Sequence, residues 1–347
     1  MTQRKLPVEL PRFRLAQLPT PLHDAPRLAA AIGVERLLIK RDDLTGFAGG
    51  GNKVRKLEFL VGDAIARGAD TLIAVGGPQS NAVRTAMVAA RAAGLEPIAV
   101  LYGDPPPTRE GNLLLDVLAG ARLDFTGQAD RESTEPAAAA LASELRAAGK
   151  HPYVLPRGGA TPVGDAAYVE AAAELDDQLA ALDAQPAAVI VATGSCGTQA
   201  GLIAGAAWLQ ARHRVCGVLV SRPRSEAVPR LLALARATAG LLELGVTIGP
   251  GDVLVEDGYL GPGFGLASPE GDAAMRLALA CEGLILDPVY TAKAMAGLAG
   301  MIASGRLPRA ASLVFMHTGG EPALYARHRL YEAAGLHLRE SEASTDA

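Results

Sequence analysis

The lysine at position 53 stands out because of the residues that precede it. Lys53 follows the run Gly49-Gly50-Gly51-Asn52 and stands at the start of an amphipathic helical pattern. Glycine adopts positive φ and lets another molecule approach the backbone closely, so this run can form the wall of a pocket. A lysine amine in such a pocket can form an imine with an aldehyde. An exposed lysine in a flexible loop is the alternative for this segment alone.

A second segment has the composition of a phosphate-binding loop. The apolar run Val189–Val191 leads into Ala192–Thr198, and a helical pattern begins near Gln199. Glycine and hydroxyl residues between a strand and a helix can hold a phosphate through backbone N–H groups and the helix N-terminus. The loop matches neither a Walker A motif, nor a nucleophile elbow around Ser195, nor the full dinucleotide fingerprint. A tight turn with a helix cap is the alternative.

A third segment is suited to hold a carboxylate. The strand-like run Thr71–Val75 leads into Gly76-Gly77-Pro78-Gln79-Ser80-Asn81. The side chains of Gln79, Ser80 and Asn81, together with free N–H groups at a helix start, can bind an anion. Ser80 as a simple helix N-cap is the alternative.

Two further polar segments lie at predicted helix or strand ends. Tyr290 stands at a helix entrance in Asp287-Pro288-Val289-Tyr290-Thr291, where packing is the ordinary role of a tyrosine. His317 follows the strand-like run Leu313–Met316 in His317-Thr318-Gly319-Gly320, and it is either a base or a hydrogen-bonded structural histidine. A lysine, a phosphate cradle, a carboxylate cradle and a strand-end threonine together form the inventory of a pyridoxal-phosphate site.

The elements that would position these segments are short apolar runs that alternate with helix-length amphipathic segments. Strands are predicted at Leu37–Lys40, Thr71–Val75, Pro97–Leu101, Tyr153–Leu155, Ala188–Ala192, Val215–Val220 and Ser312–Met316. Helices are predicted at Val54–Arg67, Ser80–Ala93, Thr161–Leu182, Thr198–Arg212, Ser225–Ala239, Ser268–Cys281 and Thr291–Ser304. This alternation predicts an α/β protein with a mostly parallel sheet covered on both faces. Such sheets bind ligands beyond the carboxyl ends of their strands, where the polar segments would meet.

The composition of the chain argues against several other classes of protein. The 347 residues are 49% hydrophobic, and the net charge of −4 with mixed signs favours neither a nucleic-acid nor a membrane partner. Cys196, Cys216 and Cys281 are widely spaced and lack metal-type pairing, so we expect reduced thiols in a cytoplasmic protein and no bound metal. The N-terminus has no apolar signal segment and no run is long enough for a membrane helix. Residues 340–347 are expected to fray.

Over nearly its whole length the chain resembles the D-cysteine desulfhydrase and 1-aminocyclopropane-1-carboxylate (ACC) deaminase family. This family lies within fold type II, the tryptophan synthase β-like pyridoxal-phosphate enzymes. The matching segments occur in the family's order, and they are Leu18–Leu22, Ile39–Asp43, Gly50–Glu58, Gln79–Asn81, Ala192–Ser195, Asp287–Tyr290 and His317–Gly320. Each segment is short, and the specificity lies in their common order.

The resemblance implies a fold and a set of site residues. It implies two three-layer α/β domains with mostly parallel sheets, with the active site between them, in a homodimer. The large cofactor-binding domain would comprise residues 1–56 and 162–347, and residues 57–161 would form a smaller inserted domain. Lys53, as the Schiff-base lysine, would be catalytic together with Ser80 and Tyr290. The cofactor-binding residues would be Lys53, Asn52, Thr193, Gly194, Ser195, Cys196, Gly197, Thr198 and Thr318, and the substrate-binding residues would be Gln79, Ser80, Asn81, Ala82, Phe264 and Tyr290.

The implied residues favour one type of reaction. A substrate amine would displace Lys53 and leave its amine free near the α-proton. Thr318 would offer the pyridine nitrogen a neutral hydroxyl, in place of the carboxylate that keeps this nitrogen protonated in other pyridoxal-phosphate folds. A neutral ring is a weaker electron sink, which favours prompt loss of a β-substituent. The expected reaction is α,β-elimination from a small amino acid, D-cysteine or a relative, to a 2-oxo acid and ammonia.

Four positions depart from the family's pattern. Thr291 stands where the deaminase branch has a glutamate, which weighs against opening of a cyclopropane ring. Ala82 replaces the usual His or Gln, and Phe264 replaces the usual Tyr, so polar groups are lost near the substrate. Cys196 occupies a glycine position in the phosphate loop, where its side chain must be accommodated.

The departures leave several functions open. Tyr259 is close enough in sequence to supply a replacement hydroxyl, and Lys56 is expected at the surface. The alternatives within pyridoxal-phosphate chemistry are ACC deamination, cysteate sulfo-lyase activity, D-serine dehydration and racemisation. A non-catalytic cofactor-binding relative is a further alternative. A nucleotide-binding oxidoreductase is disfavoured because the dinucleotide fingerprint is missing.

Overall fold

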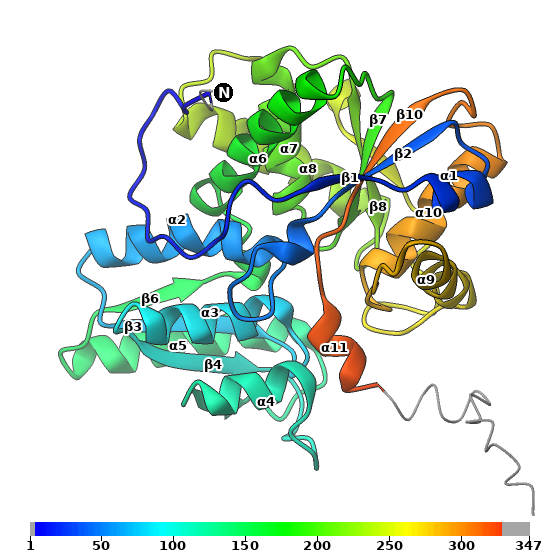
Figure 1. Ribbon diagram of the computed structural model, residues 1–347. Coiled ribbons are helices and arrows are strands. Elements are labelled where there is room, and N and C mark those ends of the chain that lie inside the picture. Colours follow the sequence, from blue (N-terminus) through cyan, green and yellow to red (C-terminus); the bar gives the residue numbers. More distant parts are fainter. Residues whose placement is uncertain (1–3, 328–347) are drawn as a thin grey trace, which may run out of the picture.

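The chain forms two separate sheets, both mostly parallel. The computed structural model describes residues 4–327, whose strands form a six-stranded and a four-stranded sheet (Figure 1). The larger sheet has the order β1-β2-β10-β7-β8-β9 and the smaller one β5-β4-β3-β6. The strands are β1 Leu22–Asp24, β2 Arg36–Lys40, β3 Thr71–Gly76, β4 Glu96–Leu101, β5 Arg122–Phe125, β6 Pro152–Leu155, β7 Ala188–Thr193, β8 Arg214–Leu219, β9 Leu254–Glu256 and β10 Ser312–Met316. Every described pairing except β1–β2 is parallel, which confirms the predicted α/β class.

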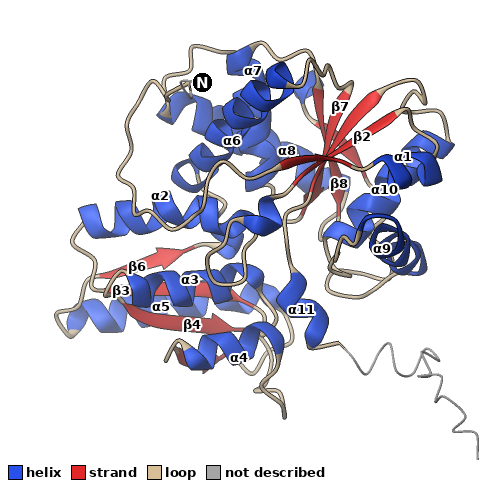
Figure 2. Ribbon diagram, viewed as in Figure 1, coloured by secondary structure: helices blue, strands red, loops and turns tan. Residues whose placement is uncertain are grey.

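Helices cover both faces of each sheet (Figure 2). The helices are α1 Pro26–Ile32, α2 Asn52–Ala66, α3 Asn81–Ala92, α4 Gly111–Leu118, α5 Thr134–Ala147, α6 Pro162–Ala181, α7 Gly197–Leu209, α8 Arg224–Leu241, α9 Pro269–Glu282, α10 Thr291–Ala303 and α11 Glu321–Tyr325. Four short 3₁₀ turns are η1 Asp42–Leu44, η2 Arg131–Ser133, η3 Arg157–Gly159 and η4 Pro250–Asp252.

The alternation of side chains along the strands explains these layers. Successive side chains of a strand point to opposite faces of its sheet. In β7, Val189 and Val191 therefore pack in the core with α6, α7 and α8, whereas Ile190 packs on the other face with α1, α9 and α10. In the smaller sheet, Leu72 of β3 packs with α2 and α3, and Ile73 packs with α5. Strands buried on both faces need continuous apolar runs, which is how the sequence revealed them.

The sequence predicted the central strands better than the edges. All seven predicted strands are present, and the three that were missed, β1, β5 and β9, have three or four residues each. Helix α2 runs from residue 52 to 66, across the predicted domain boundary after residue 56, so the division into residues 1–56 with 162–347 and 57–161 stays a prediction. Within residues 4–327, no helix has the length and apolarity needed to cross a bilayer. Residues 340–347, which were expected to fray, lie outside the described part.

A buried ionic network fixes helix α2 to the larger sheet. The Arg55 guanidinium donates to the carboxylates of Asp42 and Glu174, at Nη2–O distances of 2.9 and 2.8 Å. Lys40 at the end of β2 also pairs with Glu174, and the Tyr168 hydroxyl donates to Asp42 at 2.6 Å. All five side chains are buried. Buried charges persist only when they are paired and hydrogen-bonded, so the network allows one rotation of α2 about its axis.

The network predicts a stability effect at Glu174. Burial alone would raise the pKa of this carboxyl, but Arg55 and Lys40 outweigh it and lower the pKa. Glu174→Gln leaves the buried Lys40 without its paired carboxylate and Arg55 with Asp42 alone, and we expect it to cost about 3–5 kcal/mol of unfolding free energy. Because the pKa of Glu174 is lower in the folded than in the unfolded protein, its ionised form stabilises the fold above the ordinary carboxyl pKa. This contribution is lost as the pH falls through the folded-state pKa.

Urea denaturation at neutral pH measures this cost. Glu96→Gln, which removes an exposed partner of Lys150, is the matched control, expected to change stability by about 0–1 kcal/mol. Equal effects of the two substitutions would contradict the assigned role of the network.

Candidate active site

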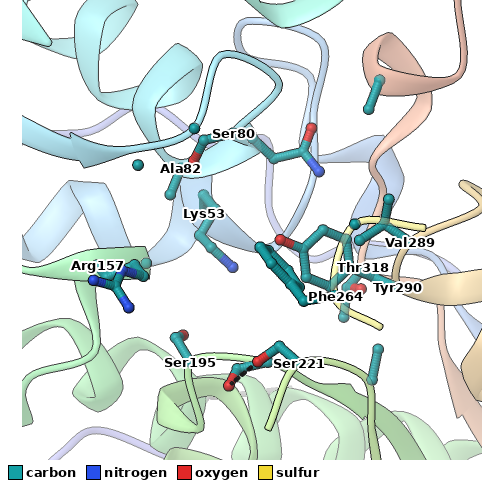
Figure 3. A pocket seen from close by; sticks show the side chains of 18 of the residues that line it. Lys53, Ser80, Ala82, Arg157, Ser195, Ser221, Phe264, Val289, Tyr290 and Thr318 are labelled. Atoms are coloured by element: carbon teal, nitrogen blue, oxygen red, sulfur yellow. Dashed lines mark hydrogen bonds between the residues drawn. The ribbon is translucent and has the colours of Figure 1, made fainter. Parts of the chain in front are cut away.

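The predicted site residues meet in one cavity between the two sheets. Its walls come from the start of α2, the β3–α3 loop, the β7–α7 loop, the 264–265 segment and the loops that precede α10 and α11. The predicted residues that line it are Asn52, Lys53, Gln79, Ser80, Asn81, Ala82, Thr193, Gly194, Ser195, Cys196, Thr198, Phe264, Tyr290 and Thr318. Gly197 is not among the lining residues. In Figure 3 the Lys53 amine points into the space bounded by Ser80, Ser195 and Tyr290.

The glycines before Lys53 are required by packing against neighbouring backbone. Gly50 and Gly51 have φ of +67° and +102°, which side-chain-bearing residues rarely adopt. A Cβ on Gly50 would lie 1.9 Å from the Asp43 carbonyl oxygen, and one on Gly51 would lie 3.0 Å from that of Thr318. The Asn52 N–H in turn donates to the Thr318 carbonyl at 3.0 Å. The glycine run therefore presses the start of α2 against the loop after β10.

The Lys53 amine has a lowered affinity for protons. Burial, reinforced by the charge of Lys56, lowers its pKa from 10.5 to about 7. Its Nζ donates a hydrogen bond to Asn52 Oδ1 at 3.1 Å, and Asn52 Nδ2 donates to Thr198 Oγ1 at 3.0 Å. The amine is thus substantially neutral, and nucleophilic, near physiological pH. The hydrogen bonds connect it directly to the candidate phosphate loop.

The β7–α7 loop provides an anion cradle at the N-terminus of helix α7. The first turn of a helix leaves backbone N–H groups without intrahelical partners, and no described side chain caps this one. Ser195, Cys196 and Thr198 at this helix start line the cavity. The Gly194 carbonyl accepts hydrogen bonds from Ser221 Oγ and Arg222 Nε at 3.0 and 3.2 Å, so the loop is held from behind. Thr193 donates its hydroxyl to Gln199 at 2.8 Å, which makes it a support of the loop.

Cys196 fits the glycine-like position at a conformational cost. Its φ of +79° lies in the left-handed region, which is uncommon for a residue with a side chain. The thiol is buried beside the Ala227 carbonyl, and burial raises its pKa. The side chain is therefore accommodated in the core beneath helix α8, where Ala227 and Leu231 are also buried.

The expected surface position of Lys56 is wrong. Lys56 is buried, and its Nζ lies 2.9 Å from Asp165 Oδ1 of helix α6. A Cβ on Gly197 would meet this pair, at 2.1 Å from the Asp165 oxygen and 2.4 Å from Nζ. Gly197 therefore lies against a buried cation directly behind the anion cradle. Sequence spacing could show that Lys56 shares a helical face with Lys53, but the facing element only appears in three dimensions.

The carboxylate cradle is ordered by helix α4. Asn112 of α4 donates to Asn81 Oδ1 at 2.9 Å, which leaves the Asn81 Nδ2 group free to donate into the cavity. Ser80 Oγ accepts from the Val83 N–H at 3.3 Å, so Ser80 is an N-cap whose own hydroxyl hydrogen remains available. Gln79 does not have a free amide group, because its Nε2 donates to the Glu110 carbonyl and its Oε1 accepts from the Asn112 N–H. It therefore joins the β3–α3 loop to the start of α4. Of the three residues predicted to bind a carboxylate, Ser80 and Asn81 therefore keep side-chain donors available to the cavity.

Tyr290 and Phe264 form the opposite wall. Their rings make an edge-to-face contact with centroids 6.2 Å apart (Figure 3). Asp287 accepts hydrogen bonds from the N–H groups of Tyr290 and Thr291 and from the Thr291 hydroxyl, and so fixes the start of α10. Burial raises the pKa of Tyr290, with Asp287 adding to the effect, so its hydroxyl keeps its proton at neutral pH. Thr291 serves the helix start and does not line the cavity.

Two of the open assignments are settled by the hydrogen bonds and packing. His317 contacts the Ile285 carbonyl through Nε2 at 3.1 Å, and its Nδ1 accepts from the Gly319 N–H at 3.3 Å. Burial lowers its pKa, and the ring is a neutral structural group that positions Thr318. The suggested replacement hydroxyl of Tyr259 is wrong, because its ring packs against Gly297 and Gly300 of α10, away from the cavity.

Comparison with known proteins agrees with this geometry. The family described as "Pyridoxal-phosphate dependent enzyme" matches residues 13–319. The chain belongs to this family. A D-cysteine desulfhydrase of Salmonella paratyphi C is 43% identical over 325 residues, which cover 92% of this chain and 96% of the relative. A D-cysteine desulfhydrase of Klebsiella pneumoniae is 42% identical over 326 residues, with the same coverage of both proteins.

Solved structures of related enzymes share the fold. The structure titled an ACC deaminase homologue has a TM-score of 0.86 and 36% identity, and it covers 94% of this chain and 96% of that one. A fungal L-serine ammonia-lyase from Rhizomucor miehei has a TM-score of 0.67 at 19% identity, covering 94% and 100%, and shows the fold alone. These neighbours confirm the fold type II architecture that the motifs implied.

The residues of the cavity fit pyridoxal phosphate. The Lys53 amine, whose pKa is lowered to about 7, lies in the same cavity as the anion cradle at the start of α7. The Lys56–Asp165 pair places a cation behind that cradle. Gly194 and Gly158 leave room in the cradle, since a Cβ on either would crowd Tyr290 or Ser195. Lys53 would hold the aldehyde carbon and the loop at residues 194–198 the phosphate.

Four arginines that line the cavity were missed by the sequence reasoning. They are Arg131, Arg157, Arg222 and Arg327. Arg157 directly precedes Gly158-Gly159, which was a usable local signal, whereas Arg131, Arg222 and Arg327 have no glycine beside them. Surface pairing is the ordinary role of an arginine, so no local pattern distinguished these three. Tyr102 also lines the cavity and packs over Gly77.

The lowered pKa of Lys53 predicts the pH dependence of cofactor uptake. Only the neutral amine attacks an aldehyde, so the rate at which apoenzyme captures pyridoxal phosphate should rise about tenfold per pH unit below pH 7 and level off above it. Stopped-flow absorbance measures this rate. Free Nα-acetyl-lysine, with its pKa near about 10.4, is the control whose rate continues to rise. A capture rate that still rises tenfold per unit at about pH 9 would contradict the assigned pKa.

Proposed function

We propose that this protein is a pyridoxal-phosphate dependent lyase that removes a β-substituent and ammonia from a small amino acid, with D-cysteine or a related β-substituted amino acid as substrate. The observation that carries the proposal is the position of the Lys53 amine between the anion cradle at residues 194–198 and the donors Ser80 and Asn81. The 43% identity to a D-cysteine desulfhydrase supports the same reaction class.

In this proposal each wall of the cavity has one task. Ser80 and Asn81 hold the substrate carboxylate through a hydroxyl hydrogen and an amide N–H. Bound pyridoxal phosphate supplies an electron sink for the carbon that bears the amino group. Lys53, displaced by the substrate amine, accepts the α-proton on Nζ, which its lowered pKa permits near neutral pH.

The opposite wall acts on the leaving group. The Tyr290 hydroxyl keeps its proton, because burial raises its pKa, so it can donate a hydrogen bond or a proton to a departing sulfur or oxygen. Asn52 and Thr318 line the part of the cavity where the cofactor ring is expected, and Thr318 offers a neutral hydroxyl. ACC deamination is the less favoured reaction, because Thr291 donates its hydroxyl to Asp287 and offers no group to the cavity.

Two further properties belong to the proposal. Cys196, Cys216 and Cys281 are all free thiols, two of them buried, which supports a reducing, cytoplasmic location. A homodimer is proposed from the family resemblance. Size-exclusion chromatography with light scattering tests the second property.

Lys53 carries the first test of this function. Purified protein should be yellow and should release 2-oxo acid and ammonia from D-cysteine, whereas Lys53→Ala should lose both the visible absorbance and the activity. Lys150→Ala, an exposed lysine paired with Glu96, is the control and should retain both. A colourless wild-type protein that does not respond to added cofactor would rule out the proposal.

Ser80 carries the second test, which concerns substrate alone. Loss of one hydrogen bond to a charged group costs about 1.5–3 kcal/mol, so Ser80→Ala should lower kcat/KM for D-cysteine by about 10- to 100-fold while the yellow colour persists. Ser80 is also the N-cap of α3, so part of the loss in Ser80→Ala can come from a weakened helix start. Glycine is a better N-cap than alanine, so Ser80→Gly removes the hydroxyl with less damage to the helix and separates the two contributions. Unchanged kcat/KM in both variants would show that the carboxylate binds elsewhere.

A further inference from the structure

The cavity has a strong charge asymmetry that cofactor binding leaves unexplained. Its described lining includes Lys53 and the four arginines at positions 131, 157, 222 and 327, and no acidic residue. The cofactor phosphate has its own cradle at residues 194–198, and the substrate carboxylate has Ser80 and Asn81. Arg222 belongs to that cradle, because it donates to the Gly194 carbonyl, and Arg157 lies beside it, next to Gly158, on which a Cβ would meet Ser195. Arg131 and Arg327 remain as cations for the part of the cavity where the substrate side chain would lie.

The acidic partners of these arginines lie on the solvent side. Arg157 pairs with Glu132 and Glu135 at 2.9 and 3.1 Å, and its Nε is buried without a hydrogen-bond partner among the described residues. Glu132 is shared, because it also lies 3.3 Å from Arg131 Nε, and its side chain is 60% exposed. These pairs hold the guanidinium groups in place, and the carboxylates of Glu132 and Glu135 are 60% and 44% exposed and do not line the cavity. Solvent exposure weakens such ion pairs.

Arg131 and Arg327 are far apart in sequence but contact neighbouring residues of the wall, Phe264 and Gly265. The Arg131 guanidinium carbon lies 5.5 Å from the Phe264 ring centroid, and its Nη1 donates to the Ser221 carbonyl at 3.1 Å. Arg327 donates through Nη2 to the carbonyl of Gly265. Among the described residues Arg327 has no acidic partner.

Both guanidinium groups act on the tyrosine that faces the substrate. Burial raises the pKa of Tyr290, and the charges of Arg327 and Arg131 oppose that rise. Phe264 and Tyr290 are in edge-to-face contact, so the two arginines flank the aromatic wall that the substrate side chain would meet. Phe264 brings no polar group to this wall, so these cations are its strongest recognition elements for an anionic side chain.

We propose that Arg131 and Arg327 form an anion subsite for the substrate's β-substituent, so that the preferred substrates are amino acids with a sulfonate, sulfinate or phosphate group on Cβ. The proposal rests on the lyase function above and specifies its substrate class. Arginine suits these groups because its planar fork binds two oxygens at once.

The reaction balances without an oxidant or a reductant. Lys53 Nζ takes the α-proton, the bond from Cβ to sulfur or oxygen breaks, and its electron pair leaves with the anion. Addition of one water to the resulting enamine, after tautomerisation, releases ammonium. For cysteate the products are pyruvate, ammonium and hydrogen sulfite, and for O-phosphoserine they are pyruvate, ammonium and phosphate.

Turnover by the holoenzyme tests the substrate preference. The D- and L-forms of cysteate and O-phosphoserine are compared with cysteine, serine and β-chloroalanine, which lack the anionic group. We expect kcat/KM for the better anionic substrate to exceed that for the neutral ones by about tenfold or more, and to fall as ionic strength rises.

Substitutions then assign the preference to the two arginines. Arg327→Gln and Arg131→Gln should each lower kcat/KM for the anionic substrate by about 10- to 100-fold and change that for β-chloroalanine by less than about threefold. The matched control is Arg224→Gln, which removes an exposed arginine paired with Asp257 outside the cavity and should alter neither. Retained yellow colour shows that each variant is folded and loaded.

A binding measurement separates this inference from the lyase function. Calorimetry compares 3-sulfopropanoate with pentanoate on the holoenzyme, since neither has an amino group to react. Tighter binding of the sulfonate that is lost in Arg327→Gln supports the subsite even if no amino acid is turned over, in which case the lyase function fails. Turnover of D-cysteine without any anionic preference in catalysis or binding overturns the subsite and leaves the lyase function intact.

Discussion

The position of the Lys53 amine depends on the buried ionic network around Arg55. Arg55 lies two residues after Lys53 in helix α2, and it joins Asp42, which follows β2, to Glu174 of α6. Isolated charges are too costly to bury, so the guanidinium must meet both carboxylates at once. This requirement fixes the rotation of α2 about its axis. Because consecutive helical residues point in different directions, it also fixes which residue of the first turn enters the cavity.

Three neighbouring cations of α2 thereby acquire three different environments. Arg55 is paired with two carboxylates, and Lys56 is paired with Asp165 behind the anion cradle. Lys53 has no carboxylate partner among the described residues, and its amine contacts only the neutral amide of Asn52. Burial and the nearby charge of Lys56 then lower the pKa of Lys53 to about 7. Lys53 is therefore reactive because the nearby carboxylates pair with Arg55 and Lys56 and leave its own amine without a counter-ion in the described part of the chain.

The sequence contained the information on backbone geometry but not on side chains that meet across the fold. Continuous apolar runs such as Val189–Val191 predicted the central strands, and the glycine-rich segments after them predicted the loops at one edge of each sheet. Short edge strands such as β9 carry too few residues for a pattern to form. The burial of Lys56 depends on Asp165, more than a hundred residues away, and the cavity position of Arg327 depends on Gly265. No local spacing records such contacts.

The departures from the family pattern acquire a common physical meaning in the cavity. Ala82 and Phe264 line it without polar groups, and Arg131 and Arg327 bring charge to the wall of Phe264 from other segments. The Cys196 thiol is buried beside the Ala227 carbonyl of helix α8. Ala82 and Phe264, by contrast, lie where a substrate would bind, so the substrate side of the cavity is where this chain would differ in function from its family.

The central claim is that Lys53, and no other lysine, holds the cofactor. Borohydride reduction of the holoenzyme fixes the cofactor to the amine that carries it, and peptide mass spectrometry locates the modified residue. Lys53 and Lys56 differ by three positions, so fragment ions must separate them. The account predicts one pyridoxyl group per chain, on Lys53. Modification of Lys56, or an even distribution over surface lysines, would contradict it.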